Sequence, residues 1–294
     1  MIGFNKKKIG FIVDSSSNIK NNDYDDVKVI PLGIIINENG KTTNYSDEPS
    51  QITWSTLKEK LMQKKIGVKT SQANMNQMIT AAAEMTKKYD QVIVLPIHRG
   101  LSGNANSWSI IKDEFNGKLC LNYVDDICFG YVWDIEIIKQ ELKKKTYNEQ
   151  QLQDFINKNI IGSRVGYLIV NDLSRLIAGG RVKNSTGLLA KLFKIKPIIL
   201  LDKTGLNFLD RVKTFKNYFE IVKKDLNNRF KGTTIKRAII FTPEDYKQNK
   251  YFPEFYDSFK LTFPKLDHVI KSMSNVITCH TGHDFFACYF EVKK

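Results

Sequence analysis

Three short polar stretches carry the side chains best suited to hold an anion. They are Thr70-Ser71-Gln72, Gly100-Leu101-Ser102-Gly103 and Cys279-His280-Thr281-Gly282. Each offers hydroxyl groups or an imidazole and is expected beside a helix start, where backbone N–H groups and the positive end of the helix dipole favour an anion. Ser and Thr before a helix are also common N-caps, so the residue types alone leave capping and anion binding both open.

The stretch around Ser102 also permits a second chemistry. Ser102, Asp172 and His280 follow one another in the chain order of a serine–acid–histidine triad. The nucleophile elbow of such enzymes has the pattern G-x-S-x-G, and Asn104 stands where its last glycine is required. Hydrolysis of acyl esters by Ser102 and His280 is therefore the alternative interpretation.

Other possible sites have weaker support. Arg99 could contact an anion or simply be solvated, and Asp125-Asp126 follows a predicted strand without a second cluster of metal ligands. The four cysteines form no C-x-x-C pair, which disfavours a zinc ribbon or a thioredoxin-type site. The pattern G-x-x-x-x-G-K-[ST] is missing, so nothing indicates ATP binding by a P-loop. We predict no metal, no cofactor and no catalytic residue.

The chain is strongly basic. Its 294 residues include 45 Lys and Arg against 31 Asp and Glu, a net charge of +14. Such a balance favours acidic partners: nucleic acid, an anionic membrane surface or anionic small molecules. No block of five or six like charges occurs, so the charge gives no specific sign of nucleic-acid binding, and we predict none. A transient contact with an anionic membrane remains a hypothesis.

The N-terminal apolar run at 9–13 is too short for a signal peptide, and no run approaches the ~20 residues of a membrane span. We therefore expect a soluble protein of the cytoplasm.

Hydrophobic patterning predicts an α/β fold. In the first half, strands and helices alternate with polar turns, which is typical of a parallel sheet with crossover helices. The predicted strands are 9–13, 27–30, 33–36, 92–95 and 119–124, and the predicted helices are 51–64, 75–88, 104–115, 129–143 and 145–158. Ligands of such sheets bind outside the carboxyl ends of the strands, where both 14–18 and the loop of Ser102 are expected.

The pattern changes after about residue 160. Predicted strands are 166–170, 196–201, 238–241, 267–270 and 287–292, with helices at 187–193 and 213–228 and a hairpin turn at Lys203-Thr204-Gly205. This mixed character predicts two α/β domains, 1–159 with a parallel sheet flanked by helices and 160–294 with a mixed sheet and helices.

The order of five motifs resembles the DegV family of bacterial fatty-acid-binding proteins. The motifs are IGFIVDSSSNI, VKTSQA, GLSGNANS, LIAGGRV…LLAKLFKIKPIILLDKTG and HTG, and the resemblance runs from residue 9 to about 290. It implies a two-domain α/β fold with a long-chain fatty acid between the domains. It also implies that the protein is not itself an enzyme but the binding subunit that presents the acid to a separate fatty acid kinase, which forms an acyl phosphate for phospholipid metabolism.

The resemblance also implies roles for single residues. Thr70 and Ser102 match the hydroxyls that bind the carboxylate, and His280 matches the histidine near it. Ser71, Gly103 and Arg181 match neighbouring motif positions.

Several positions depart from the family pattern. His98-Arg99 replaces small residues before G-L-S-G, Asn104 replaces a threonine, and His283-Asp284 follows H-T-G. The basic segment typical of the family is Lys213-Thr214-Phe215-Lys216 here, which weakens an arginine-based contact with the kinase.

Overall fold

The computed structural model describes residues 7–171, 173–183 and 195–293, and the chain divides into two compact units. Unit 1 consists of Met1–Thr53 and Lys65–Ile160, and unit 2 of Trp54–Lys64 and Ile161–Lys294. The predicted domains differ from these units in the segment 54–64. Its helix α1 (Trp54–Met62) belongs with unit 2, where Arg175 Nη2 donates a hydrogen bond to Leu61 O at 2.7 Å and Lys58 pairs with Asp245.

Unit 1 is built on a four-stranded parallel sheet. Its strands β1 (Ile9–Asp14), β2 (Val27–Ile30), β6 (Gln91–Leu95) and β7 (Leu119–Leu121) lie in the order β2-β1-β6-β7. The residues of β6 and β7 are buried throughout, as expected for strands with both faces covered. The predicted parallel sheet is therefore confirmed.

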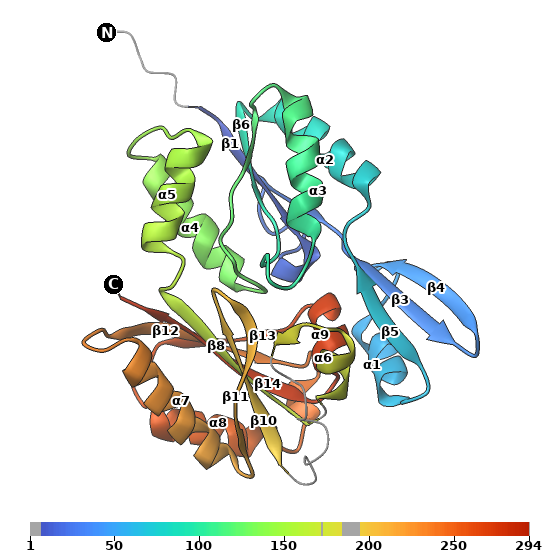
Figure 1. The fold of residues 1–294 in the computed structure, drawn as a ribbon, viewed down its shortest axis with the longest axis vertical. Coiled ribbons are helices and arrows are strands. Elements are labelled where there is room, and N and C mark those ends of the chain that lie inside the picture. Colours follow the sequence, from blue (N-terminus) through green and yellow to red (C-terminus); the bar gives the residue numbers. More distant parts are fainter. Residues whose placement is uncertain (1–6, 172, 184–194, 294) are drawn as a thin grey trace. The chain divides into compact units, whose positions relative to one another are not determined.

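Helices cover this sheet. Figure 1 shows α2 (Met75–Lys88) and α3 (Asn104–Ile111) along one side of it and α4 (Gly130–Leu142) and α5 (Glu149–Asn159) along the other. Short 3₁₀ turns, η1 (Ser15–Ser17) and η2 (Lys112–Phe115), follow β1 and α3. The buried face of α5 is formed by Leu152 and Ile156, whereas Phe155 is half-buried and packs against Tyr147.

A small antiparallel sheet, which the sequence patterning did not predict, completes unit 1. It consists of β3 (Gly33–Glu38), β4 (Lys41–Ser46) and β5 (Gly67–Ser71) in the order β4-β3-β5. Asn39 and Gly40 join β3 to β4 with φ values of 52° and 80°, a two-residue turn that suits Asn-Gly. The strand β4 escaped prediction because its residues are polar and exposed or half-buried.

Unit 2 contains a seven-stranded mixed sheet in the order β13-β12-β14-β8-β10-β11-β9. Its strands are β8 (Arg164–Val170), β9 (Val182–Lys183), β10 (Lys196–Asp202), β11 (Gly205–Val212), β12 (Ile235–Thr242), β13 (His268–Ser272) and β14 (Phe285–Val292). The predicted hairpin is present, since Asp202 pairs with Gly205 between β10 and β11. The predicted helix at 187–193 lies outside the described residues.

The helices α7 (Phe215–Arg229) and α8 (Phe252–Thr262) lie side by side on one face of this sheet, as Figure 1 shows. The helices α6 (Ser174–Ala178) and α9 (Asn275–Thr281) pack against each other, and the 3₁₀ turn η4 (Tyr246–Gln248) precedes α8.

Aromatic rings fill the layer between the sheet and α7 and α8. The ring of Phe219 lies 5.1 Å from that of Phe255 and 5.8 Å from that of Phe259, and all three side chains are fully buried. The buried hydroxyl of Tyr218 donates to Tyr167 O at 2.7 Å, so this large side chain enters the core without an unpaired polar atom.

We expect Phe219→Ala to lower the free energy of unfolding by about 3–5 kcal/mol, because it removes a ring from a closely packed cluster. The control is Leu261→Ala at the end of α8, where 79% of the leucine is exposed and the change is expected to stay within about 0.5 kcal/mol. Urea denaturation of both variants measures the difference, and similar values for the two would contradict this description of the core.

Candidate functional site

The carboxyl edge of the parallel sheet contains a topological switch point. The chain passes from β1 outward to β2, then crosses to the other side of β1 to form β6 and β7. Loops that leave neighbouring strands in opposite directions open a crevice where α/β proteins bind ligands. The turn after Asp14 and the loop from Pro96 to Gly103 leave the sheet at this point.

Asp14 holds these two segments together. This carboxylate is 1% exposed and accepts hydrogen bonds from Ile97 N at 2.8 Å, Asn104 Nδ2 at 3.0 Å, and Ser16 N at 3.1 Å, with the Ser16 hydroxyl as a fourth donor. Burial raises the pKa of Asp14, and its hydrogen bonds oppose that rise without cancelling it. The carboxylate therefore fixes where the Ser102 loop begins and where α3 starts.

Ser102 and Gly103 form the start of α3. Gly103 is the N-cap residue, and the half-buried Ser102 accepts a hydrogen bond from Asn104 N at 3.2 Å through its Oγ. The serine is thus at a helix start, as predicted. It lies several residues beyond the end of β6, in contrast to a nucleophile elbow, where the serine is on the sharp strand-to-helix turn itself. Asp172, the acid of the alternative triad, lies outside the described residues.

Thr70 and Ser71 are not at a helix start, which corrects the prediction for this stretch. They end β5, and α2 begins at Met75 with Asn74 as its N-cap. Ser71 is paired with Gly33, and a Cβ on that glycine would clash with Ser71 Oγ, so the serine hydroxyl occupies the space above it. The side chain of Thr70, the preceding residue of the strand, is directed to the opposite face.

The Thr70-Ser71-Gln72 and Ser102-Gly103 stretches meet within unit 1. A Cβ on Gly103 would lie 3.6 Å from Gln72 Oε1. Gln72, the residue after β5, therefore lies beside Gly103 at the start of α3, although the two residues are about thirty positions apart in sequence.

The departures His98 and Arg99 are both engaged in the structure. The Arg99 guanidinium forms two hydrogen bonds with Asp125, at 2.9 Å from Nε and 2.6 Å from Nη2, and it lies over the ring of Tyr123. Burial alone would raise the pKa of Asp125, but the bonds to Arg99 lower it below its ordinary value. His98 Nδ1 accepts a hydrogen bond from Gly100 N at 2.9 Å, which places a neutral ring's proton on Nε2. These contacts hold the loop before Ser102 in one conformation.

His280 and Arg181 lie close together in unit 2. His280 is in the last turn of α9, whose end is marked by Gly282 with a φ of 82°. The prediction of a helix start at this stretch is therefore wrong, and the helix dipole there does not favour an anion. A Cβ on Gly179 would lie 2.7 Å from His280 Nδ1, so only glycine leaves room for this imidazole, and Arg181 donates a hydrogen bond to Gly179 O.

The His280 imidazole is neutral at physiological pH. Burial, together with the nearby positive charge of Arg181, lowers its pKa to about 4. A neutral imidazole can donate one hydrogen bond to a carboxylate without bringing a buried charge of its own.

The structure thus groups the predicted site residues in two sets. Thr70, Ser71, Ser102 and Gly103 belong to unit 1, and Arg181 and His280 belong to unit 2. Two positions that support them were not predicted as site residues, Asp14 and Gly179. An acid at the end of a fully apolar strand was a signal for Asp14, but no local pattern shows that the glycine is opposed by a histidine a hundred residues away.

No group of three or more His, Cys, Asp or Glu side chains in the described part of the chain is arranged to hold a metal ion. Over the same residues, no helix is both long enough and apolar enough to cross a membrane.

A family model described as "Uncharacterised protein, DegV family COG1307" matches residues 8–293. The chain belongs to the DegV family. A DegV domain-containing protein of Mycoplasma genitalium is 28% identical over 95% of this chain and 98% of its own length. One from Staphylococcus aureus is 24% identical over 92% of this chain and 94% of its own length.

Solved DegV structures share the fold. A DegV family protein of Thermus thermophilus, described by its fatty acid binding, superposes with a TM-score of 0.78 at 20% identity. The match covers 97% of this chain and 100% of that protein. The fatty acid binding DegV family protein of Streptococcus agalactiae has a TM-score of 0.78 at 22% identity, covering 98% and 99% of the two chains. A DegV protein of Eubacterium eligens loaded with heptadecanoic acid has a TM-score of 0.77 at 15% identity, covering 97% and 100%. The predicted two-domain α/β fold is confirmed.

The low pKa of His280 predicts a specific pH dependence of stability. Since the pKa is about 4 in the folded protein and 6.5 in an ordinary environment, the unfolded chain binds the proton more readily below pH 6.5. The stability linked to the neutral imidazole is fully present above pH 6.5 and is lost as the pH falls toward 4. We expect the unfolding free energy of the wild type to drop more between pH 7 and 5 than that of His280→Gln.

Urea titrations of both proteins at several pH values measure this difference. His268→Gln is the control, because that ring lies outside this pair and bonds to Tyr256 and Leu266 O. Parallel pH curves for the wild type and His280→Gln would show that the imidazole is not held neutral by the fold.

Proposed function

We propose that this protein binds a long-chain fatty acid and holds its carboxylate with the hydroxyls of Thr70 and Ser102 and the imidazole of His280. The observation that carries the proposal is the match to the DegV family over residues 8–293, joined to a fold shared with proteins described as fatty acid binding. The site residues follow from the family motifs, and the geometry within each unit agrees with their chemistry.

The unit 1 residues supply neutral donors. Ser102 is half-buried at the start of α3, where the first backbone N–H groups of the helix lack intrahelical partners. A carboxylate beside Ser102 would accept a hydrogen bond from its hydroxyl and be stabilised by the positive end of the helix dipole. Gly103 and Ser71 act as neighbours: the glycine leaves this helix start open, and the serine shapes the end of β5 beside Thr70.

The unit 2 residues add one donor and one charge. His280, neutral because its pKa is about 4, would donate an N–H hydrogen bond to the carboxylate. Arg181 nearby would add the attraction of its positive charge. The carboxylate would thus stay ionised, since hydrogen bonds and a positive charge both favour the charged form of an acid.

The alkyl chain is expected to supply most of the affinity. Burial of one methylene contributes about 0.8 kcal/mol, so a 16-carbon acid gains on the order of 10 kcal/mol before the costs of association. The polar residues fix the position of the head group, whereas the length of the apolar space selects the chain.

We further propose that the bound acid is presented to a separate fatty acid kinase in the cytoplasm, which phosphorylates the carboxylate to an acyl phosphate. The segment Lys213-Thr214-Phe215-Lys216 is the matching contact region of the family. Phe215 is buried in the core of unit 2, while Lys213 and Lys216 are exposed. Thr214 is also exposed but caps α7 by accepting a hydrogen bond from Asn217 N, so the two lysines supply the charge that this segment offers to a partner.

The binding proposal is tested by Ser102→Ala. We expect the dissociation constant for a 16- or 18-carbon acid to rise roughly tenfold or more, because a hydrogen bond to a charged group is lost. Ser109→Ala on the same helix is the matched control. Among the described residues, this exposed serine bonds only to Asn106 O, at 2.7 Å, so its loss should leave the affinity unchanged. Calorimetry with delipidated protein measures both, and mass spectrometry of the untreated protein identifies any acid that co-purifies.

Equal affinities for the two variants would remove Ser102 from the site, and failure of every fatty acid to bind would reject the function itself. A serine hydrolase would instead be labelled at Ser102 by a fluorophosphonate probe.

The presentation proposal is tested with ATP, the acid-loaded protein and a purified catalytic subunit of a fatty acid kinase. We expect acyl phosphate, trapped as the hydroxamate with hydroxylamine, only when both proteins are present. Lys213→Glu together with Lys216→Glu should slow its formation without changing fatty-acid affinity, because the two lysines lie at the start of α7 and not among the carboxylate donors. Formation at the wild-type rate would place the kinase contact elsewhere.

A further inference from the structure

The helix α1 belongs to unit 2, although the chain on both sides of it belongs to unit 1. It follows β4 and precedes β5, two strands of the small sheet of unit 1. Its apolar side is buried through Trp54, Leu57 and Leu61, and it packs against α9. The chain at 63–66 then leads back to β5, the strand of Thr70. The attachment of α1 to unit 2 therefore bears on a strand that carries a proposed carboxylate donor.

Arg175 of α6 holds the last turn of α1. The last carbonyl groups of a helix have no partners inside the helix, and a positive charge is favoured at this end. Arg175 Nη2 donates a hydrogen bond to one of these carbonyl groups, Leu61 O, at 2.7 Å. Among the described residues, the guanidinium forms this hydrogen bond alone. The side chain is half-buried, so the contact is partly shielded from water.

The stem of the same side chain lies against the end of α9. A Cβ on Gly282, the residue that follows α9, would lie 3.9 Å from Arg175 Cδ. In return, the imidazole of His280 on α9 occupies the space beside Gly179, the residue that ends α6. The ends of α6 and α9 thus interlock, and Arg175 and His280 are the two side chains that make the contact.

An ion pair attaches α1 to unit 2 in the same region. Lys58, near the middle of α1, pairs with Asp245. Burial lowers the pKa of His283, which follows Gly282, and the nearby positive charges of Lys58 and Arg175 lower it further. Both attachments of α1 are therefore close to the residues that follow α9.

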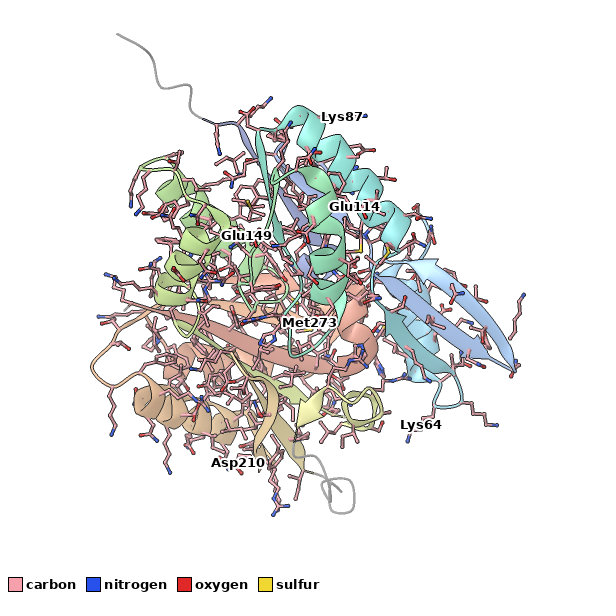
Figure 2. All side chains as sticks on the ribbon, turned by 45° about the horizontal axis from the view of Figure 1, so that its top comes forward. Lys64, Lys87, Glu114, Glu149, Asp210 and Met273 are labelled. Carbon is pink, nitrogen blue, oxygen red and sulfur yellow. The ribbon has the colours of Figure 1, made fainter. Side chains whose placement is uncertain are left out.

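We propose that Arg175 is a positioning residue of the fatty-acid site, which ties the segment that leads to Thr70 to the helix that carries His280. The connection from α1 to β5 is short, and Ile66 within it is buried. Figure 2 labels Lys64, which lies in this connection. Movement of α1 is therefore passed on to β5. Arg175 has this role only if the proposed function holds, because it acts on the same carboxylate donors.

Arg175→Met tests this role, since methionine keeps an apolar stem beside Gly282 and removes the donor and its charge. We expect the dissociation constant for a 16-carbon acid to rise roughly tenfold, because a hydrogen bond from a charged group is lost. Most of the change should be in the dissociation rate. Arg175→Lys should bind within about threefold of the wild type, since an ammonium group can also donate to Leu61 O. Calorimetry with delipidated protein measures these affinities.

The matched control is Arg211→Met. This exposed arginine is on β11 of the same unit, next to Asp210, which Figure 2 labels. The substitution makes the same chemical change away from α1, α6 and α9, so the affinity should stay at the wild-type value.

A double-mutant cycle with Thr70→Ala identifies how the effect of Arg175 reaches the ligand. If Arg175 acts through Thr70, Arg175→Met should weaken binding by less than about threefold in a protein that already carries Thr70→Ala. Independent effects would multiply instead.

Hydrogen exchange of the ligand-free proteins measures the docking of α1 directly. We expect Arg175→Met to speed amide exchange at 54–62 about tenfold, because local opening of α1 becomes easier. Arg175→Lys and Arg211→Met should leave this exchange unchanged. Exchange in α7 should be the same in all the variants, whereas a general loss of the fold would raise it.

Four results would overturn the proposal. They are wild-type affinity in Arg175→Met, wild-type exchange of α1 in that variant, binding by Arg175→Lys as weak as by Arg175→Met, and effects that multiply in the cycle with Thr70→Ala. A wild type that binds no fatty acid would instead reject the proposed function, and the role of Arg175 with it.

Discussion

A buried carboxylate at the end of β1 holds the edge of unit 1 that carries the candidate site residues. Asp14 accepts hydrogen bonds from the loop after β6 and from the first residue of α3, two segments about ninety residues away in sequence. Because these bonds are buried, replacing the carboxylate would leave donors without partners and lower the free energy of unfolding. The position of Ser102 therefore depends on the end of a strand that contributes no side chain to the proposed carboxylate site.

Unit 2 shows the same dependence on support from outside the motif. His280 is at a helix end, where the local dipole does not favour an anion, and burial and the charge of Arg181 keep its imidazole neutral. Gly179 is required because any side chain there would meet the imidazole. A neutral histidine beside a fixed positive charge can attract a carboxylate without proton transfer, as the proposed binding role requires.

Long, strongly periodic elements were predictable from sequence. The apolar runs of β1, β6 and β8 and the amphipathic helix α2 agree with their predicted ranges to within about two residues. The strands β4 and β5 were missed because they are mostly polar and exposed or half-buried, so neither a hydrophobic run nor a buried face marked them. Of the three polar stretches, only the one at Ser102 is at a helix start, since hydroxyl residues also end strands and line helix ends.

The sequence by itself determined the family, the two α/β units and the residue types of the candidate site, because motif order and hydrophobic period are local properties of the chain. Tertiary structure alone decided which segments meet: Gln72 with Gly103, Asp14 with Asn104, and Gly179 with His280. It also decided that the segment 54–64 belongs to unit 2. Such contacts depend on packing between residues far apart in sequence, which no local pattern records.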